Sequence, residues 1–363
     1  MEFVQIRSYM QGPVSSIILG LLFYGVLHFS AALFGGLNEL LEISIVVVIV
    51  FIRLISFIVE RIKSTRITRN ILNFCEVLLW LVLMYGILTI IVYIVKLVIL
   101  IPESVLIALY GILIPILAIY AYVNAHRITI KEHTLYINNL TEELDIIHVS
   151  DLHIGSIHNK SLLNSLVVKI NPVEADIVII SGDLADGSCP ITEDMFMPLK
   201  DSNKPIFFVY GNHDYYMGID PLDKATENAN ITTLRNEMIN FKGLNIYGLP
   251  FSFSSRDQEL MLKNIKGIGD KIDSTQANLL VFHIPSNWEY FSSIGFDIQL
   301  SGHTHGGQFY PMTFLIKLMF PYSKGLFKKD NSYLSVTAGL GTFSSPMRWG
   351  TNCELVLLHL KRN

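Results

Sequence analysis

The sequence predicts an α/β domain preceded by an all-α transmembrane module of about four helices. One observation is the distribution of charge. Residues 1–124 contain only seven Lys and Arg and six Glu, out of 27 basic and 31 acidic residues in the chain. A second observation is that short β-rich runs alternate with helical patterns after residue 143, as is typical of α/β folds. We therefore expect a transmembrane helical module at 1–124 and a separate α/β domain at 125–363.

Four apolar stretches in the first part are long enough to cross a bilayer, which needs about 20 apolar residues. They lie at residues 13–34, 43–59, 77–95 and 104–125. Arg53 interrupts the second stretch, and an arginine inside a span is costly unless it reaches the interface or is paired. We interpret the first stretch as a retained span. The alternative is a removable signal peptide, whose apolar core is usually about 7–15 residues long.

The charges of the short links predict the orientation of these spans. Residues 60–70 carry four basic side chains, whereas the link between the first two stretches carries two Glu and no Lys or Arg. By the positive-inside rule the 60–70 link is cytoplasmic, and four spans then place residues 125–363 in the cytoplasm as well. The sequence thus predicts a multi-pass protein of the cell membrane, with the lipid bilayer as a partner and the oligomeric state undetermined.

Composition also excludes some classes of function. The net charge is +1 for residues 1–124 and −5 for the remainder, so we expect no nucleic acid polymer as a partner. The three cysteines, Cys75, Cys189 and Cys353, are far apart and outside any C-x-x-C spacing. They are therefore interpreted as packing residues and not as disulfide partners or thiolate ligands.

Polar and glycine-rich motifs follow five β-rich runs of the second part. The runs are LDIIHVS, DIVIIS, IFFVY, NLLVF and DIQLS, and the motifs that follow them are DLH, GDLAD, GNHD, His283 and GHTHGG. Polar residues are common in loops, so one such ending means little. Five in series, each with an oxygen or imidazole donor, predict a ligand site where successive strand ends converge on one rim of a sheet. A further strand is expected within residues 124–137, which alternate polar and apolar side chains.

The donors at these strand ends are too many for one ion. They comprise two carboxylates, four imidazoles and one amide oxygen: Asp151, Asp183, His153, His283, His303, His305 and Asn212. Two divalent ions about 3.5–4 Å apart, with one carboxylate shared, would use all of them. A mixed nitrogen and oxygen set without thiolate favours Mn, Fe or Zn over Ca or Mg. In an extended turn, His303 and His305 would point to opposite sides, so that each could serve a different metal.

These ordered motifs resemble those of the calcineurin-like metallophosphoesterases. D-x-H, G-D-x-x-D, G-N-H-D, a lone His and G-H-x-H occur in that order from about residue 143 onward. The stretches GNHDYY, GHTHGGQ and GLGTFSSPMRWG are most similar to the bacterial membrane-associated YkuE/YaeI-like phosphoesterases. The resemblance implies a four-layer αββα sandwich for residues 125–363. It does not cover the first 124 residues.

The resemblance also implies roles for individual residues. The first metal would be held by Asp151, His153 and His305, the second by Asn212, His283 and His303, and Asp183 would bridge them. His213 would be the general acid or would stabilise the transition state, and Asp214 would orient it. Arg348 has two interpretations. Its guanidinium could bind a second phosphate or an anionic headgroup, or it could be a surface arginine paired with an acid.

Other polar residues near the motifs are assigned less specific roles. Asp186 is expected to support a ligand or simply to belong to the loop, and His148 and His158 are expected to pack or to face solvent. Residues 311–329 mix apolar side chains with four lysines. They fit an interfacial segment on an anionic leaflet, or a core helix followed by a basic loop. Pro311 and Pro321 limit any helix there to under three turns and favour the core helix.

The leading hypothesis is a membrane-anchored dimetal phosphoesterase. It would hydrolyse a phosphodiester or pyrophosphate bond, of a phospholipid or a nucleotide-linked lipid, by attack of a metal-bridging hydroxide. Within the same chemistry, the alternative is a hydrolase of soluble nucleotides or phosphoproteins that uses the helices only as an anchor. A second alternative is a membrane sensor with a structural metal site. A channel or transporter gains support only from Arg53 and His28 within the spans.

Overall fold

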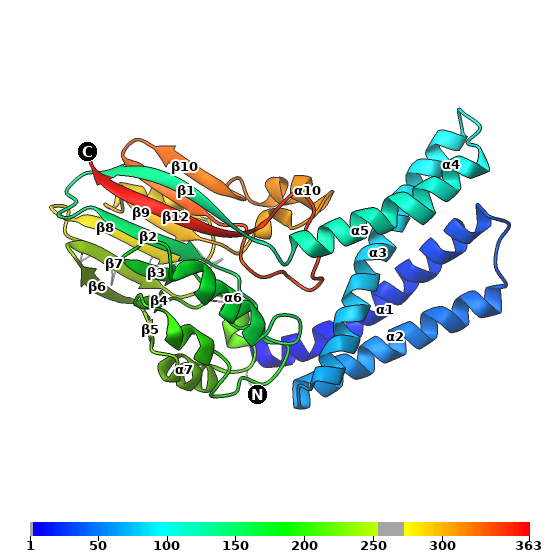
Figure 1. Cartoon of the computed structure of the whole chain (residues 1–363), viewed down its shortest axis with the longest axis horizontal. Helices are drawn as coiled ribbons and strands as arrows, with labels where there is room; N and C mark the ends of the chain where they lie inside the picture. Colours follow the sequence, from blue (N-terminus) through cyan, green and yellow to red (C-terminus); the bar gives the residue numbers. More distant parts are fainter. Residues whose placement is uncertain (1–2, 253–271) are drawn as a thin grey trace. The chain divides into compact units, whose positions relative to one another are not determined.

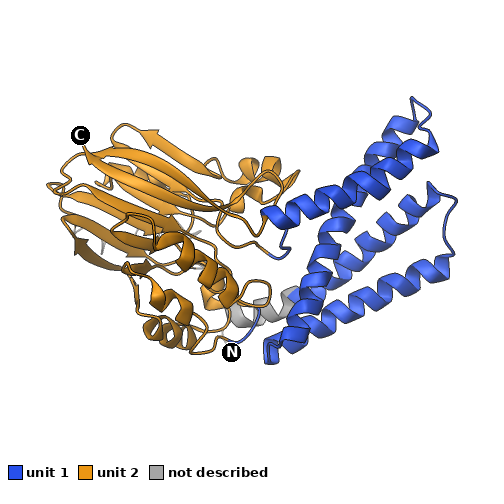
Figure 2. Ribbon diagram, viewed as in Figure 1, with its two compact units in different colours: residues 1–124, 188–190, 344–347 blue, residues 125–187, 191–343, 348–363 orange. Residues whose placement is uncertain are grey.

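The computed structural model describes residues 3–252 and 272–363 of the chain (Figure 1). The chain forms two compact units. Unit 1 contains residues 1–124 and two short segments, 188–190 and 344–347. Unit 2 contains residues 125–187, 191–343 and 348–363 (Figure 2). The change from unit 1 to unit 2 along the main part of the chain thus falls at residue 124.

Unit 1 is helical. Its elements are α1 (Phe3–Ala32), α2 (Glu39–Ile62), α3 (Arg66–Lys96), α4 (Glu103–Ala108), a π-helical turn (Leu109–Leu113) and α5 (Ile114–Asn124). Among the described residues, four helical stretches are long and apolar enough to cross a membrane: Gly12–Ala32, Glu39–Ile62, Arg66–Lys96 and Glu103–Asn124. The prediction of about four such helices is confirmed. The basic link expected at 60–70 is mostly helical, because only residues 63–65 lie between α2 and α3.

A buried ion pair joins α2 and α3. The Nε and Nη2 atoms of Arg53 donate to Oε1 of Glu76 at 3.1 and 2.8 Å, and Nη1 donates to Oγ of Ser16 at 2.6 Å. The Ser344 hydroxyl, in one of the short segments of unit 1, donates to the second oxygen of Glu76. Pairing with a carboxylate therefore satisfies the intramembrane guanidinium, which otherwise would have to reach the interface.

Removing either partner of this ion pair should destabilise the protein. We expect Arg53→Met and Glu76→Met each to lower the free energy of unfolding by about 3–5 kcal/mol, because a buried charge is left unpaired. Unfolding in detergent measures the effect, and Arg66→Met, at an exposed arginine of α3, is the control. The double variant should lose much less than the sum of the two. Additive losses would show that Arg53 and Glu76 do not stabilise the fold as a pair.

Unit 2 contains two mixed six-stranded sheets. The first has the order β1-β12-β2-β3-β4-β5 and the second the order β10-β11-β9-β8-β7-β6. The strands of the first sheet are β1 (Ile128–Ile137), β12 (Cys353–Arg362), β2 (Leu144–Val149), β3 (Ile177–Ile180), β4 (Ile206–Phe208) and β5 (Ile231–Thr233). Those of the second are β10 (Gly325–Lys329), β11 (Ser332–Val336), β9 (Ile298–Ser301), β8 (Ala277–Phe282), β7 (Leu244–Leu249) and β6 (Glu237–Phe241).

The main core lies between the two sheets. Side chains of β1, β12, β2, β3 and β4 pack there against side chains of β7, β8, β9 and β11. Strand β8 shows the alternation expected of a strand covered on both faces. Leu279 and Val281 join this core, whereas Leu280 and Phe282 join a second cluster with Phe291, which lies on a helix that covers the other face. The α/β prediction with two packed sheets is confirmed.

The helices of unit 2 are short and amphipathic. Among the residues that the structure describes, they are α6 (Lys160–Ile170), α7 (Ile219–Asn228), α9 (Trp288–Ser293) and α10 (Met312–Met319), with 3-10 turns at Met197–Asp201, His213–Tyr215 and His305–Gly307. In α6 the buried residues recur every three or four positions, so that one face of the helix is covered. The three cysteines are buried, which agrees with their interpretation as packing residues.

All five β-rich runs that end in ligand motifs form strands, and residues 128–137 form β1 as expected. Their distribution corrects one expectation. β2, β3 and β4 are parallel neighbours in the first sheet, whereas β8 and β9 are parallel neighbours in the second. The ligand motifs therefore lie at the carboxyl ends of two sheets that face each other, and not along the rim of one sheet.

Candidate metal centre

Loops of the first sheet position four of the candidate ligands. Asp151 and His153 follow β2, Asp183 follows β3, and Asn212 follows β4. Asp151, His153 and Asp183 are almost completely buried. Because the three strands are adjacent and parallel, their carboxyl ends bring these side chains to the same place.

Loops of the second sheet supply the other three candidates. His283 follows β8 directly, and His303 and His305 follow β9. Gly302 allows the two sheets to meet here: a Cβ at this position would lie 2.1 Å from Oγ of Ser150 and 2.3 Å from Oδ2 of Asp151. Only a glycine can bring the β9 loop this close to the β2 loop.

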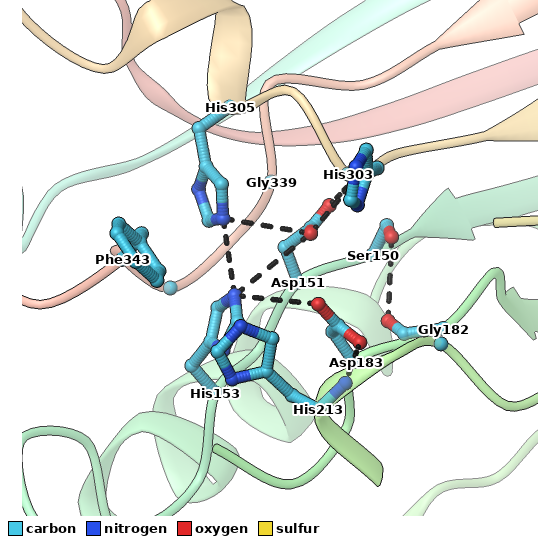
Figure 3. Close-up of polar contacts among 12 residues, drawn as sticks. Ser150, Asp151, His153, Gly182, Asp183, His213, His303, His305, Gly339 and Phe343 are labelled. Atoms are coloured by element: carbon cyan, nitrogen blue, oxygen red, sulfur yellow. Dashed lines mark hydrogen bonds and ion pairs between the residues drawn. The ribbon is translucent and has the colours of Figure 1, made fainter. Parts of the chain in front are cut away.

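The first group of donors consists of Asp151, His153 and His305, whose ligand atoms lie within 4.8 Å of one another. Nε2 of His153 is 3.0 Å from Nε2 of His305, and Oδ1 of Asp151 is 3.8 and 3.5 Å from these two nitrogens (Figure 3). Two imidazole nitrogens and a carboxylate oxygen therefore face a common point.

The second group consists of Asp183, His283 and His303, again within 4.8 Å of one another. Oδ2 of Asp183 is 3.2 Å from Nε2 of His283 and 3.8 Å from Nε2 of His153. Asp183 thus lies between the two groups, and a third set joins it to His153 and His213. His303 and His305 belong to different groups, although a 3-10 turn beginning at His305 replaces the extended turn that the sequence suggested.

Two buried ligand atoms are left unsatisfied by the protein. Within residues 3–252 and 272–363, Oδ1 of Asn212 and Nε2 of His283 have no hydrogen-bond partner. Oδ2 of Asp183 lies 3.2 Å from Nε2 of His283 as an ion-pair contact. Buried polar atoms are nearly always paired, and exceptions mark functional sites or bound ions. Both atoms belong to the set expected to hold the second metal, so the donors present fit a divalent cation there.

The charges in the site are strongly coupled. Burial alone would lower the pKa of His283, but the carboxylates of Asp183 and Asp151 raise it to about 9. Burial would likewise lower the pKa of His153, and the carboxylates of Asp186, Asp183 and Asp151 raise it instead. The site therefore stabilises positive charge next to its carboxylates, which is the electrostatic requirement for binding cations.

The main chain is left-handed at five of the seven candidate ligands. Asp151, His153, Asp183, His303 and His305 have φ values of 53°, 48°, 53°, 72° and 50°. Residues other than glycine rarely adopt this conformation, and it clusters at functional sites. Here it turns the side chain back from the strand end into the space between the sheets.

His213 lies beside the ligand groups, and its ring is fixed by a main-chain oxygen. Its Nδ1 is 2.8 Å from the carbonyl oxygen of Asp186, and its main-chain N–H donates to Oδ1 of Asp183 at 2.9 Å. A carbonyl only accepts, so Nδ1 carries a proton and Nε2 is the free ring nitrogen. The ring lies 4.7 Å from that of His153 and 4.8 Å from that of Tyr216.

The printed sequence places Asp214 next to His213, but the contacts of its carboxylate are with the main chain of other residues. Its carboxylate accepts main-chain N–H groups of Asp183, Ala185 and Gly211 at 2.9, 2.8 and 2.7 Å. Nδ1 of the His213 ring donates instead to the main-chain oxygen of Asp186. Burial and the nearby Asp183 carboxylate raise the pKa of Asp214 to about 7. Asp214 therefore ties together the loops after β3 and β4, and does not orient the imidazole directly.

Arg348 is placed differently from one of its two interpretations, that of a surface arginine. Its side chain is completely buried, and Nη2 donates to the carbonyl oxygens of Ala338, Gly339 and Gly341 at 2.7, 3.1 and 2.6 Å. Nη1 donates to Oγ1 of Thr351 at 2.9 Å. The guanidinium is thus not a surface group, and its Nη2 also lies 3.5 Å from Nδ1 of the candidate ligand His305. A contact with a substrate phosphate stays a prediction.

Sequence reasoning undervalued two residues of the site. Oδ1 of Asp186 is 3.4 Å from Nδ1 of His153, an ion-pair distance that does not meet hydrogen-bonding geometry, and it lies where an outer-sphere partner of a ligand imidazole would be. Phe343 is 55% exposed, and its ring lies 5.7 Å from that of His213 and 6.4 Å from that of His153. An exposed phenylalanine at the edge of a polar site carries no motif signal of its own. The second aspartate of GDLAD was visible as a candidate.

The two other histidines near the motifs have structural partners. His148 is buried between Oγ of Ser335 and Oγ of Ser181, at 3.2 and 2.8 Å, and burial lowers its pKa to about 3. Nε2 of His158 accepts the main-chain N–H of Thr342 at 2.9 Å. Packing is therefore the role that their environments support, as expected.

Comparison with known proteins supports the interpretation of the motifs. Residues 144–307 match the family model described as calcineurin-like phosphoesterase. An uncharacterized metallophosphoesterase of Helicobacter pylori is 33% identical over 243 residues, 66% of this chain and 65% of the relative. A metallophosphoesterase of Campylobacter jejuni is 31% identical over 256 residues, 69% of this chain and 68% of the relative. The chain is also similar to a transmembrane protein with metallophosphoesterase domain of Danio rerio, 27% identical over 276 residues, 68% and 61% of the two chains. The match thus covers just under two thirds of the Helicobacter relative's length.

Proposed function

Because this chain belongs to the calcineurin-like metallophosphoesterase family, we propose that it is a metal-dependent phosphoester hydrolase anchored in a membrane. The observation that supports this most strongly is the arrangement of Asp183 between two groups of buried donors. One shared carboxylate between two N/O ligand sets is the arrangement that a two-metal hydrolase requires.

We assign the first metal to Asp151, His153 and His305, with Asp183 shared, and the second to Asn212, His283 and His303. Imidazole and carboxylate donors without thiolate suit Mn, Fe or Zn. When bound, two such ions would supply a hydroxide at neutral pH and would neutralise the charge that develops on the phosphate oxygens.

The residues of the chain then have separate tasks. His213 holds a proton for the departing oxygen. Because its Nδ1–H is bonded to the carbonyl of Asp186, Nε2 can donate a proton only from the imidazolium form. Asp186 keeps both His213 and His153 oriented, through its main-chain oxygen and its carboxylate respectively. Arg348 and Asp214 fix the loops that bear the donors.

The preferred substrate is a phosphodiester or pyrophosphate of a lipid. Four apolar helices anchor the chain in a bilayer, and the exposed Phe343 ring offers apolar surface at the edge of the site. The alternative is a soluble nucleotide or phosphoprotein, with the helices serving only as an anchor. The basic side chains around residues 60–70 support a cytoplasmic position for unit 2.

A purely structural metal site, as in a membrane sensor, agrees less well with these contacts. Structural sites are closed by their ligands, whereas hydrolytic sites keep a position open. A histidine that is oriented beside two donor groups, with its Nε2 left for a reacting atom, has no purpose in a closed site.

The test is hydrolysis of bis(p-nitrophenyl) phosphate by the full-length protein in detergent. The protein is first treated with a chelator and then given Mn, Fe or Zn in turn. We expect activity only after metal is restored, with unchanged circular dichroism throughout. Metal that binds without hydrolysis of this ester, of a phospholipid or of a nucleotide diester would contradict the proposed activity and favour the sensor.

A further inference from the structure

The helix α10 (Met312–Met319) has its apolar face turned outward. Thr313 is buried, whereas Phe314, Leu318 and Met319 are 62%, 84% and 72% exposed. In a helix that covers a soluble core, apolar side chains face inward. The prediction of a core helix at 311–329 is therefore wrong, and the outward apolar face needs another explanation.

This helix is built onto the rim of the candidate metal centre. It begins seven residues after His305, and the main-chain N–H of Thr313 donates to the oxygen of Phe309 at 3.2 Å. At its other end, the ring of Phe320 lies 5.5 Å from that of His303. Both ends of α10 are thus fixed next to residues of the proposed metal ligand set.

The charged side chains within residues 311–329 all have one sign. Residues 311–329 contain four lysines and no acidic residue. Lys317 is exposed on α10 itself, and Lys328 and Lys329 are exposed on β10. Nζ of Lys324 donates to the main-chain oxygen of Gly350 at 3.0 Å. Apolar side chains next to lysines match the two parts of an anionic lipid surface, its acyl chains and its headgroups.

The covalent connection keeps unit 2 near a bilayer. Helix α5 ends at Asn124 and β1 begins at Ile128. Only residues 125–127 lie between them, and the four steps of extended chain from residue 124 to residue 128 span at most about 14 Å. The domain that carries α10 is therefore tethered to an apolar helix long enough to cross a membrane.

We propose that α10 inserts its outward face, with Phe314, Leu318 and Met319, into the interface of an anionic lipid leaflet. The lysines of residues 311–329 contact the headgroups, and the rim formed by α10 and Phe343 lies toward the lipid phosphates. Insertion would give the site access to a lipid substrate, and this part of the inference rests on the proposed function. The insertion itself can be measured without any hydrolysis.

The test uses the full-length protein in lipid nanodiscs with an environment-sensitive fluorophore on Leu318→Cys. The native cysteines are buried, so labelling reports the introduced thiol. The matched control is Val168→Cys on α6, where the native side chain is 76% exposed. An inserted face lies about 5–10 Å below the headgroup surface, so a shallow spin-labelled lipid should quench the label at 318 about twofold or more and leave that at 168 nearly unchanged.

Three outcomes would overturn the proposal. Equal quenching at positions 318 and 168 would show that the face stays in water. Protection of the label only in discs that hold two chains would show that α10 contacts a second copy. Unchanged quenching after Lys317, Lys328 and Lys329 are all replaced by Glu, in discs rich in phosphatidylglycerol, would overturn the choice of an anionic leaflet. Hydrolysis of a soluble diester, measured in the same discs, tests the proposed function separately.

Discussion

Asp183→Asn should lower metal-dependent hydrolysis by more than about 100-fold, because loss of a mere outer-sphere partner of a metal ligand already costs about 10–100-fold. The side-chain oxygen of the asparagine can still accept the main-chain N–H of His213, so the local fold is kept. The negative charge between the two donor groups is lost. Metal content by mass spectrometry should fall together with the turnover number.

The control for this variant is Asp201→Asn, at an exposed aspartate of the 3-10 turn Met197–Asp201. It should keep full activity and full metal content. If Asp183→Asn retained both its metal and its turnover, the shared carboxylate would not be the centre of the reaction. The two-metal assignment would then have to be abandoned.

His213→Gln should lower the turnover number by about 10²–10⁴, the usual contribution of general acid catalysis, while the metal content stays the same. The size of the loss should depend on the leaving group. A nitrophenolate leaves readily without a proton, whereas an alkoxide does not. The loss should therefore be smaller for bis(p-nitrophenyl) phosphate than for an alkyl phosphodiester.

This dependence on the leaving group separates a proton donor from a residue that only supports the site. His359→Gln, at a partly exposed histidine of β12, is the matched control. An equal loss on both substrates would assign His213 to positioning. Loss of bound metal would assign it to the ligand set, where its proximity to His153 and Asp183 would allow it to bind.

The sequence predicted the fold class and the strand-end motifs, but not the order in which the strands pair. The ligand motifs could be found because strand periodicity and the residues that follow each strand are local signals. Pairing is not local. In the first sheet, β12 lies between β1 and β2, so Ile128 is paired with Cys353 across almost the whole domain. Such registers depend on which faces become buried together, which no short stretch of sequence records.

The errors at single residues have the same origin. In the sequence, nothing distinguishes Arg348 from an anion-binding arginine. In the structure, its guanidinium donates to carbonyl oxygens of residues 338–341. Asp214 stands next to His213 in the sequence, yet its carboxylate faces the main chain of other loops. In α10 the apolar pattern predicts a helix correctly, but a pattern cannot show whether the apolar face meets a core or a membrane.

The left-handed main chain at five candidate ligands has a consequence for how such a domain can evolve. Each of these residues holds a conformation that costs about 1 kcal/mol or more, and folding must supply that free energy before any metal arrives. Selection for activity retains these residues despite the cost in stability. A descendant freed from catalysis could gain stability most easily by placing glycine or asparagine at positions 151, 153, 183, 303 and 305. In a relative that has kept the fold but lost hydrolytic activity, substitutions should appear first at these positions.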